Sequence, residues 1–300
     1  MPAVLSVEKL YKSFGSKSVI TDLSFDVEKG SIFAFLGANG SGKTTTIRCL
    51  LNILKPTSGT TSVFGSQFSL DMAPKIGYLP EERGLYATTR VAETLVYFGE
   101  LKGIERRKAT TWAYEYLERV GLSDHAQTEI KKLSSGQQQK IQLGITLINQ
   151  PELLILDEPT KGLDPVNRAL FMNMFADFNA QGATIVFVSH QMDEVEQIAD
   201  SLVMIKNGKR ALYGPLQNVK QQFGTNTIHL SFSGEIPVND ALYEQTHTEK
   251  NETQLTPKPN ITPKEILHFL TEQQLTISDY SLGAPSLQDI FVRVMDDPTY

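Results

Sequence analysis

The hydrophobic positions along the chain follow two different strand patterns. Residues 4–10 and 23–27 alternate apolar with polar positions, which is typical of strands that bury one face. Residues 32–36, 153–156 and 183–188 are instead nearly continuous apolar runs, as in strands of a parallel sheet that is covered on both faces. The pattern predicts half-buried strands near the N-terminus and an α/β arrangement with a parallel sheet beyond them.

A helical pattern separates the apolar runs. Large apolar residues recur at helical spacing between residues 91 and 122, and a further helix is predicted at about 138–148. The stretches 202–205 and 210–213 flank Asn207-Gly208, which is a strong hairpin signal. We therefore expect a helical insertion within the α/β part, and a hairpin after the last apolar run.

A phosphate-binding motif follows the first apolar run. Residues 37–44 read GANGSGKT and match G-x-x-x-x-G-K-[ST] between a predicted strand and a predicted helix. Glycines let successive N–H groups surround phosphate oxygens at the helix N-terminus. Lys43 supplies a charge to the outer phosphates, and the Thr44 hydroxyl is suited to ligate Mg²⁺. The alternative, a glycine-rich turn that opens an ordinary helix, does not explain why Lys and Thr both follow.

Acidic and imidazole side chains follow the later apolar runs. Asp157 and Glu158 end the run that starts at residue 153, and His190 follows the run 183–188. Parallel strands bring their carboxyl ends to one sheet edge, where ligands bind. We expect Asp157 to hold Mg²⁺, Glu158 to polarise an attacking water, and His190 to reach the γ-phosphate. Alternatively, the two acids merely terminate a strand, and a lone His is structural.

Two weaker signals have a structural alternative each. The segment LSSGQ begins at residue 133, and its Ser and Gly residues could present a hydroxyl and N–H groups to an anion, or could simply cap the following helix. Phe14 lies between the two predicted N-terminal strands. Its ring could stack on a nucleotide base, although aromatic residues serve mainly in the core.

Composition and charge limit the cellular compartment and the kinds of partner that we expect. The chain has 300 residues, a net charge of −6 and a single cysteine, Cys49, which fits a reducing cytoplasm. No apolar run approaches the roughly 20 residues of a membrane span, and no signal-peptide core precedes the first strand. Residues 226–300 carry eleven Asp and Glu against four Lys and Arg, and no basic block indicates nucleic acid as a partner. We expect a large domain at 1–222, with its helical part at about 84–150, and a small α+β domain at 223–300.

The ordered set of Phe14, GANGSGKT, LSSGQ, LLILDEP, GLD and SH resembles the nucleotide-binding subunit of ATP-binding cassette (ABC) transporters, over about residues 4–215. The C-terminal PSLQDIFV is similar to the small domain on bacterial cassette ATPases related to sodium and drug exporters. The resemblance implies a P-loop NTPase of ABC type, with an antiparallel β subdomain and a helical insertion, followed by a small α+β domain.

The resemblance also implies roles for single residues. Phe14 would stack on adenine, Asp157 would be the magnesium carboxylate, Glu158 the general base, and His190 the γ-phosphate switch. The phosphates and Mg²⁺ of ATP would lie against Gly37, Ala38, Asn39, Gly40, Ser41, Gly42, Lys43, Thr44 and Thr45. The γ-phosphate bound by a facing subunit would be touched by Ser134, Ser135, Gly136 and Gln137.

Two positions depart from the family pattern. Glu81 stands where the family usually has Gln, and its carboxylate could still meet Mg²⁺ or water while adding negative charge beside the phosphates. Ser135 stands where Gly is usual, which costs some backbone freedom.

The function implied is ATP hydrolysis that energises a separate transmembrane permease subunit, with export as the expected direction. Two ABC subunits, identical or different, would form the working dimer on the inner face of the cell membrane. The permease would press on the face around Glu81–Phe98. The alternative is a soluble ABC-type ATPase of translation or DNA repair, which resembles tandem cassettes or carries a long coiled coil, and neither feature occurs here.

Overall fold

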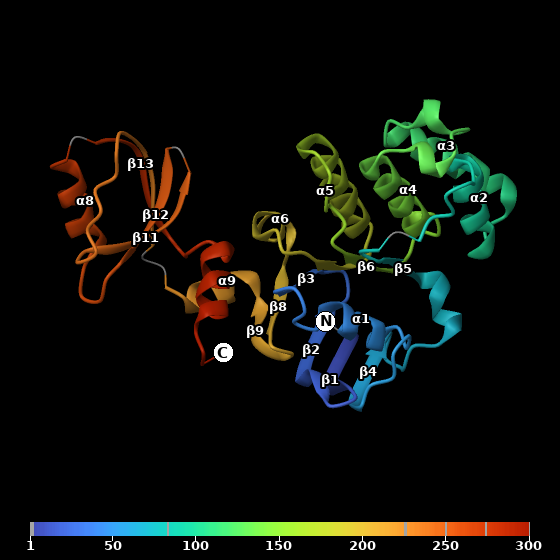
Figure 1. Ribbon diagram of the computed structural model, residues 1–300, viewed down its shortest axis with the longest axis horizontal. Coiled ribbons are helices and arrows are strands. Elements are labelled where there is room, and N and C mark those ends of the chain that lie inside the picture. The colour runs from blue at the N-terminus through green and yellow to red at the C-terminus, as the bar shows by residue number, and fades with distance from the viewer. Residues whose placement is uncertain (1–2, 83, 225–226, 250, 274, 300) are drawn as a thin grey trace. The chain divides into compact units, whose positions relative to one another are not determined.

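The computed structural model describes residues 3–82, 84–224, 227–249, 251–273 and 275–299 (Figure 1). The chain divides into two compact units, Met1–Tyr213 and Gly214–Tyr300. The division expected after residue 222 differs from this one, because helix α7 (Leu216–Gln222) groups with the second unit.

The N-terminal strands form a three-stranded antiparallel sheet. Strand β1 (Ala3–Phe14) lies between β2 (Lys17–Glu28) and β4 (Ser58–Val63). Leu5 pairs with Val27 on one side and with Val63 on the other, and all three are buried. The expected half-buried strands and the antiparallel subdomain are confirmed, and both N-terminal strands extend further than the alternating pattern indicated.

The second sheet of this unit has six strands in the order β5-β6-β7-β3-β8-β9. Its central strands are parallel and fully buried, as continuous apolar runs predict: β3 (Ile32–Gly37), β6 (Leu153–Asp157) and β7 (Thr184–Val188). The flanking strands are β5 (Ile76–Leu79), β8 (Ser201–Lys206) and β9 (Lys209–Pro215). The sheet is accompanied by helices α1 (Lys43–Leu50), α5 (Pro165–Ala180) and α6 (Met192–Ile198).

Aromatic packing joins the two sheets into one core. Phe25 on β2 stacks on Phe33 of β3 with ring centroids 5.6 Å apart, and it lies 5.4 Å from the ring of Phe35. All three rings are buried in one apolar cluster. The antiparallel subdomain is thus fixed to the strand that leads into the phosphate loop.

The helical insertion lies between β5 and β6. It contains α2 (Val91–Leu101), α3 (Arg106–Arg119) and α4 (Ser135–Leu147). Short 3₁₀ turns precede and punctuate it at Leu70–Lys75, Ser123–His125 and Ile130–Lys132. Lys102, after α2, donates to Ile145 O at 2.6 Å and to Asn149 Oδ1 at 2.7 Å. This ammonium provides a hydrogen-bond donor for the backbone carbonyls at the C-terminal end of α4, which lack partners within the helix.

The second unit is a small α+β domain, as expected. Its antiparallel sheet has the order β11-β12-β10-β13, with β10 (Thr227–Ser233), β11 (Tyr243–Glu249), β12 (Glu252–Pro257) and β13 (Thr276–Gly283). Helix α8 (Pro263–Thr271) starts at a proline with a capping box from Thr262, and α9 (Leu287–Asp296) follows β13. Ile228, Leu255 and Ile266 lie in the buried cluster of this unit. Within the described residues, no helix of either unit is long and apolar enough to cross a membrane.

Candidate functional site

The phosphate loop connects β3 to α1, and its backbone conformation requires glycine at Gly37 and Gly42. A Cβ on Gly37 would lie 2.5 Å from both Ile205 O and Ser41 Oγ. Gly42 caps α1 in a left-handed conformation with φ 110°. These constraints aim the N-terminus of α1 at the space beside the loop, where its N–H groups can receive an anion.

Lys43 folds back against the loop that precedes it. Its Nζ donates to Gly37 O at 2.7 Å and to Ala38 O at 3.2 Å, and the residue is 8% exposed. Burial lowers the pKa of Lys43, and the charges of Glu158 and Asp157 oppose that shift. The ammonium therefore lies where the motif predicts the outer phosphates of a nucleotide.

Asp157 and Thr44 meet at the carboxyl edge of the parallel sheet. Thr44 Oγ1 donates to Asp157 Oδ2 at 3.0 Å, and Asp157 is 2% exposed. Burial raises the pKa of Asp157 to about 6, partly opposed by this hydrogen bond. A hydroxyl and a carboxylate oxygen placed together are the hard oxygen ligands that Mg²⁺ prefers. The chemistry of the pair fits this ion.

Glu158 adopts a strained backbone. Its φ is 51°, an unusual value for a residue with a Cβ, and its N–H donates to Val188 O of β7 at 2.9 Å. His190 Nδ1 lies 2.8 Å from Glu158 Oε2, an ion pair when the imidazole is protonated. Strain of this kind persists where the surrounding structure holds it and is concentrated at functional sites.

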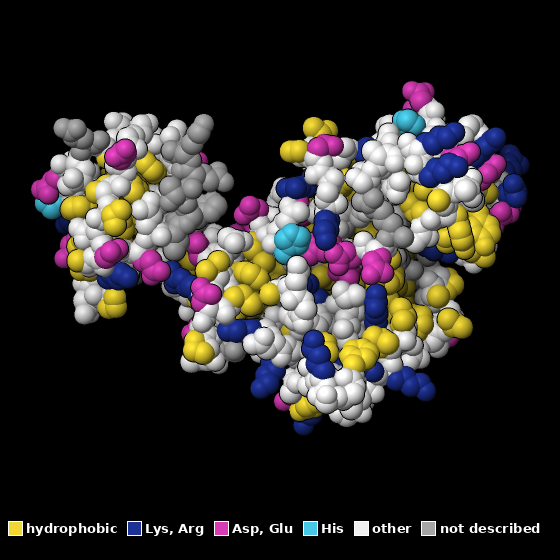
Figure 2. All heavy atoms as spheres, in the orientation of Figure 1, with side chains coloured by type: hydrophobic (Ala, Val, Ile, Leu, Met, Phe, Trp, Pro, Cys, Tyr) yellow, Lys and Arg dark blue, Asp and Glu magenta, His cyan; other side chains and the backbone are white. Residues whose placement is uncertain are grey.

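Half of the predicted site residues line one hollow of about 600 Å³, whereas His190 and the remaining residues of the set are outside its described lining. Figure 2 shows acidic side chains gathered near the middle of this unit's drawn face, beside a histidine. The lining contains Asn39, Gly40, Gly42, Lys43, Thr44, Thr45, Glu81, Asp157 and Glu158. It also contains Lys17, Ser18, Val19 and Asn207, which sequence reasoning missed. One of them, Asn207, belongs to the turn that the hairpin signal predicted. In the structure, Thr21 N donates to Gly208 O at 2.9 Å, which joins that turn to β2.

Phe14 lies at the β1–β2 turn, outside the described lining of the hollow. It is 49% exposed, and Lys12 Nζ lies 4.8 Å from its ring centroid. The core alternative for Phe14 is therefore wrong, and an exposed ring remains available at this end of the unit.

The segment Ser134–Gln137 also lies outside the described lining of the hollow in its own chain. Ser134 Oγ accepts from Gln137 N at 3.2 Å, and Gln137 Oε1 accepts from Ser134 N at 2.9 Å. Within one chain these residues therefore cap the N-terminus of α4, as the structural alternative predicted. Ser135 is the first residue of α4, and Gly136 follows it.

Two further contacts surround Glu81 and Glu158. Glu81 Oε1 forms an ion pair with Lys161 Nζ at 2.6 Å, which the sequence did not indicate. The turn after Glu158 is held from its other side, because Thr160 Oγ1 donates to buried Glu194 Oε2 at 2.6 Å.

Replacing Asp157 by Asn should stabilise the protein free of nucleotide and Mg²⁺. With its pKa near 6 in the fold and about 3.8 when unfolded, Asp157 binds a proton only in the folded state between these values. The free energy of unfolding therefore falls as pH rises through this window, and the deficit persists at neutral pH. Denaturant unfolding should give Asp157→Asn an advantage of about 2 kcal/mol at pH 7 that disappears near pH 4. The exposed Asp71→Asn is the control, and parallel pH curves for wild type and Asp157→Asn would contradict the expectation.

The fold and the site define a nucleoside triphosphatase unit with a phosphate-binding loop. Comparison with known proteins agrees. Residues 20–161 match the ABC transporter family, and residues 214–295 match the C-terminal domain of DrrA1-3-like ATP-binding proteins. The chain belongs to the family of ABC transporter ATP-binding proteins and is an ATPase subunit that binds nucleotide and works with a transmembrane permease component.

Several relatives support this membership along the chain. The uncharacterized ABC transporter ATP-binding protein YhaQ of Bacillus subtilis (strain 168) is 36% identical over 97% of this chain and 98% of that protein. The bacitracin transport ATP-binding protein BcrA of Bacillus licheniformis is 36% identical over 77% of this chain and 75% of that protein. Among solved structures, an ATP-binding subunit of an ABC transporter is 27% identical with a TM-score of 0.69, covering 74% of this chain and 93% of that one.

Proposed function

We propose that the hollow around Lys43 binds ATP with Mg²⁺ and hydrolyses it to drive a membrane permease. The observation that carries this proposal is the meeting of Thr44, Asp157 and Glu158 beside the loop that Lys43 folds against. The triphosphate would lie along the loop 37–45, with Lys43 and the N–H groups of α1 facing its oxygens. Exposed Phe14 would stack on the base at the β1–β2 end of the unit.

Thr44 and Asp157 would hold Mg²⁺, which supplies charge neutralisation between the phosphate oxygens when bound. Glu81, at the rim of the same hollow, would meet the ion or its water only at the expense of its pair with Lys161. We therefore assign the principal ligand role to Thr44 and Asp157.

Glu158 would act as the general base. Its carboxylate is 5% exposed and follows directly after Asp157, so that it can accept a proton from a water placed at the γ-phosphate. His190 lies against the same carboxylate with a half-exposed side chain. The Nδ1 atom of the imidazole can thus orient Glu158 while the rest of the ring approaches the γ-phosphate.

A second ABC subunit, identical or different, would complete the site. Ser134–Gln137 does not line the hollow of its own chain, yet its capped helix N-terminus presents N–H groups suited to a phosphate. In a head-to-tail dimer this segment would face the γ-phosphate bound by the partner. Binding of ATP would then close the dimer, and hydrolysis would open it.

The permease would dock on the apolar surface between β5 and α2. Tyr86, Tyr97 and Phe98 form a ring cluster with centroids 5.5 to 6.4 Å apart. Tyr86 is 56% exposed and Tyr97 is 47% exposed, which is unusual for packed aromatic rings on a soluble surface.

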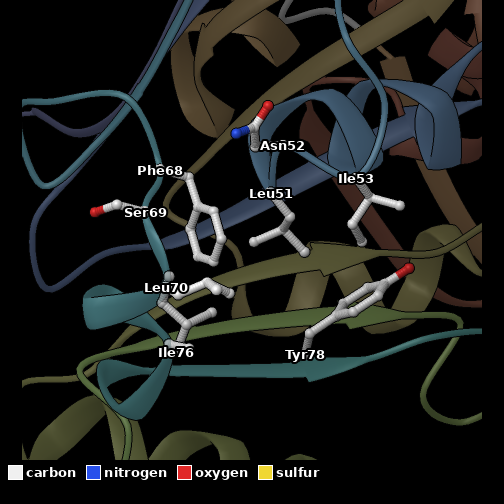
Figure 3. A pocket seen from close by; sticks show the side chains of 9 residues that line it. Leu51, Asn52, Ile53, Phe68, Ser69, Leu70, Ile76 and Tyr78 are labelled. Carbon is white, nitrogen blue, oxygen red and sulfur yellow. The ribbon is translucent and has the colours of Figure 1, made fainter.

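An apolar hollow of about 490 Å³ lies at the start of β5, where Phe68 and Leu70 face Leu51 (Figure 3). Tyr78 lines this hollow and also a smaller one that contains Glu81 and Thr44. Through Tyr78, the apolar hollow therefore borders the smaller hollow that contains Glu81, so a permease segment bound in the apolar hollow could shift the backbone that carries Glu81.

The names of the relatives support export as the direction of transport. One is a linearmycin resistance ATP-binding protein of Bacillus subtilis (strain 168), and another is a Nod factor export ATP-binding protein of Paraburkholderia xenovorans (strain LB400). We propose the inner face of the cell membrane as the location, with the permease as anchor. No finding favours the alternative function in translation or DNA repair.

The test is co-expression of the tagged chain with the membrane protein encoded beside its gene. The wild-type chain should co-purify with that protein, and its Mg-dependent ATP hydrolysis should change in the complex. Tyr97→Asp should lose the complex, because a charge would be buried against the permease, while the isolated variant binds ATP as wild type does. Val238→Asp, an 80% exposed position in the second unit, should leave the complex intact. Equal co-purification of Tyr97→Asp would remove this surface from the proposal.

A further inference from the structure

An ion pair joins the two acidic loops of the nucleotide site. Glu81 follows β5 and Lys161 follows β6, and the carboxyl ends of these neighbouring parallel strands lie side by side. Glu81 Oε1 and Lys161 Nζ are 2.6 Å apart, with side chains 45% and 57% exposed. An exposed pair contributes little to folding stability, so stability alone does not account for its place at the rim of the hollow.

The backbone at both ends of this pair is held by one helix. Gln142 Nε2 on α4 donates to Pro80 O at 3.3 Å and to Glu82 O at 3.2 Å, on either side of Glu81. Gln139 Nε2, one helical turn earlier, donates to Pro159 O at 3.1 Å.

The turn that carries Lys161 is closed by its own backbone. Lys161 N donates to Glu158 O at 3.2 Å. These hydrogen bonds thus hold the backbone at both ends of the ion pair, which keeps the two side chains within reach of each other.

The charges around the hollow are unbalanced without Lys161. Glu81, Asp157 and Glu158 line it, together with the ammonium groups of Lys17 and Lys43. A bound triphosphate would add several negative charges to this set. Glu81 raises the pKa of Lys161 first through their hydrogen bond and then through its charge, so the ammonium remains protonated near neutral pH. Lys161 also interacts with the charges of Glu158 and Asp157.

We infer that Lys161 is the counter-cation of Glu81, which lets a carboxylate stand at the rim of the nucleotide site without repelling the phosphates of MgATP. The inference rests on the proposed function, because it takes the hollow as the ATP site. Lys161 is a positioning and charge-compensating residue that acts through Glu81, and it is not assigned a contact with the reacting atoms.

The test measures nucleotide affinity for Lys161→Met, Glu81→Gln and the double variant, by calorimetric titration of the full chain with the non-hydrolysed analogue MgAMP-PNP. Lys161→Met should raise the Kd about threefold, and Glu81→Gln should lower it by a similar factor, as expected for half-exposed charges near a polyanion. The double variant should return close to the wild-type value. The shifts should shrink in about 0.5 M NaCl, because salt screens exposed charges.

The same two strands provide a matched control at their opposite ends. Lys75 precedes β5 and Glu152 precedes β6, with Nζ and Oε1 3.3 Å apart and side chains 57% and 48% exposed. Lys75→Met, Glu152→Gln and their double variant remove a pair of the same kind away from the hollow. Their Kd values should equal that of wild type.

Each other outcome has a definite meaning. If both single variants weaken binding and the double variant is no better, the pair is only a mechanical link between two loops, and charge compensation is refuted. An unchanged Kd in Lys161→Met refutes it as well. If Lys43→Ala binds MgAMP-PNP as wild type does, the hollow is not the nucleotide site, and the proposed function fails independently of Lys161.

Discussion

Glu158→Gln should abolish ATP turnover while preserving ATP binding. The amide has nearly the shape of the carboxylate but cannot accept the proton of an attacking water, and loss of a general base costs about 10²–10⁴-fold in rate. Glu158 is almost fully buried and its N–H is bonded to Val188 O, so the substituted side chain should occupy the same place. Single-turnover phosphate release should fall by at least about 100-fold.

The same variant should accumulate an ATP-bound dimer. When hydrolysis is blocked, the step that separates the subunits is lost, and size-exclusion chromatography with MgATP should show a dimer peak that wild type shows only transiently. Glu28→Gln, an exposed acid at the end of β2, is the control for the loss of one charge. Normal turnover by Glu158→Gln, or a monomer with ATP bound, would disprove the role of this residue or of the dimer.

Lys43→Ala should remove most of the affinity for ATP with little change in the fold. In the structure the ammonium donates to two loop carbonyls, Gly37 O and Ala38 O. When a triphosphate binds, its oxygens would accept these hydrogen bonds instead. Charge-assisted hydrogen bonds in a buried site are the strong ones. We expect the Kd for MgATP to rise at least about tenfold, since one such interaction is worth roughly 1.5–3 kcal/mol.

Two measurements distinguish a loss of ATP affinity in Lys43→Ala from a loss of folding stability. The thermal unfolding midpoint of Lys43→Ala without nucleotide should stay close to that of wild type, whereas the increase in midpoint at a fixed MgATP concentration should be clearly smaller than for wild type. Lys29→Ala changes an exposed lysine in the turn between β2 and β3, and it should retain the full increase. An unaltered response of Lys43→Ala to MgATP would contradict the placement of the phosphates.

The sequence predicted the parallel strands and the residues at their ends well, because both are encoded locally. Buried strands such as β6 are visible as apolar runs, and the carboxyl edge of a parallel sheet is a fixed place for Asp157 and Glu158. The strand lengths at the N-terminus were less visible, since β1 and β2 continue past the alternating pattern to a turn at residues 15–16.

Other features of the site depend on contacts between distant segments. Lys161 and Glu81 are 80 residues apart, and nothing in either neighbourhood indicates the other. Gln142 gave no signal, because a glutamine inside a helix is ordinary until its amide is seen to meet Pro80 O and Glu82 O. For Phe14, burial and exposure were both compatible with its local sequence, and only the packing of the β1–β2 turn decided.

The sequence by itself indicated the chemistry of this protein: a phosphate loop at residues 37–44, acids that follow a buried strand, and helix-capping groups at Ser134–Gly136 for which we propose an anion-binding role. These follow from backbone conformation and residue type over a few positions. Only the tertiary structure decided which side chains share a site, because Thr44 and Asp157 meet across 113 residues and Lys161 meets Glu81 across two strands. Contacts of that range are set by how the sheets and helices pack.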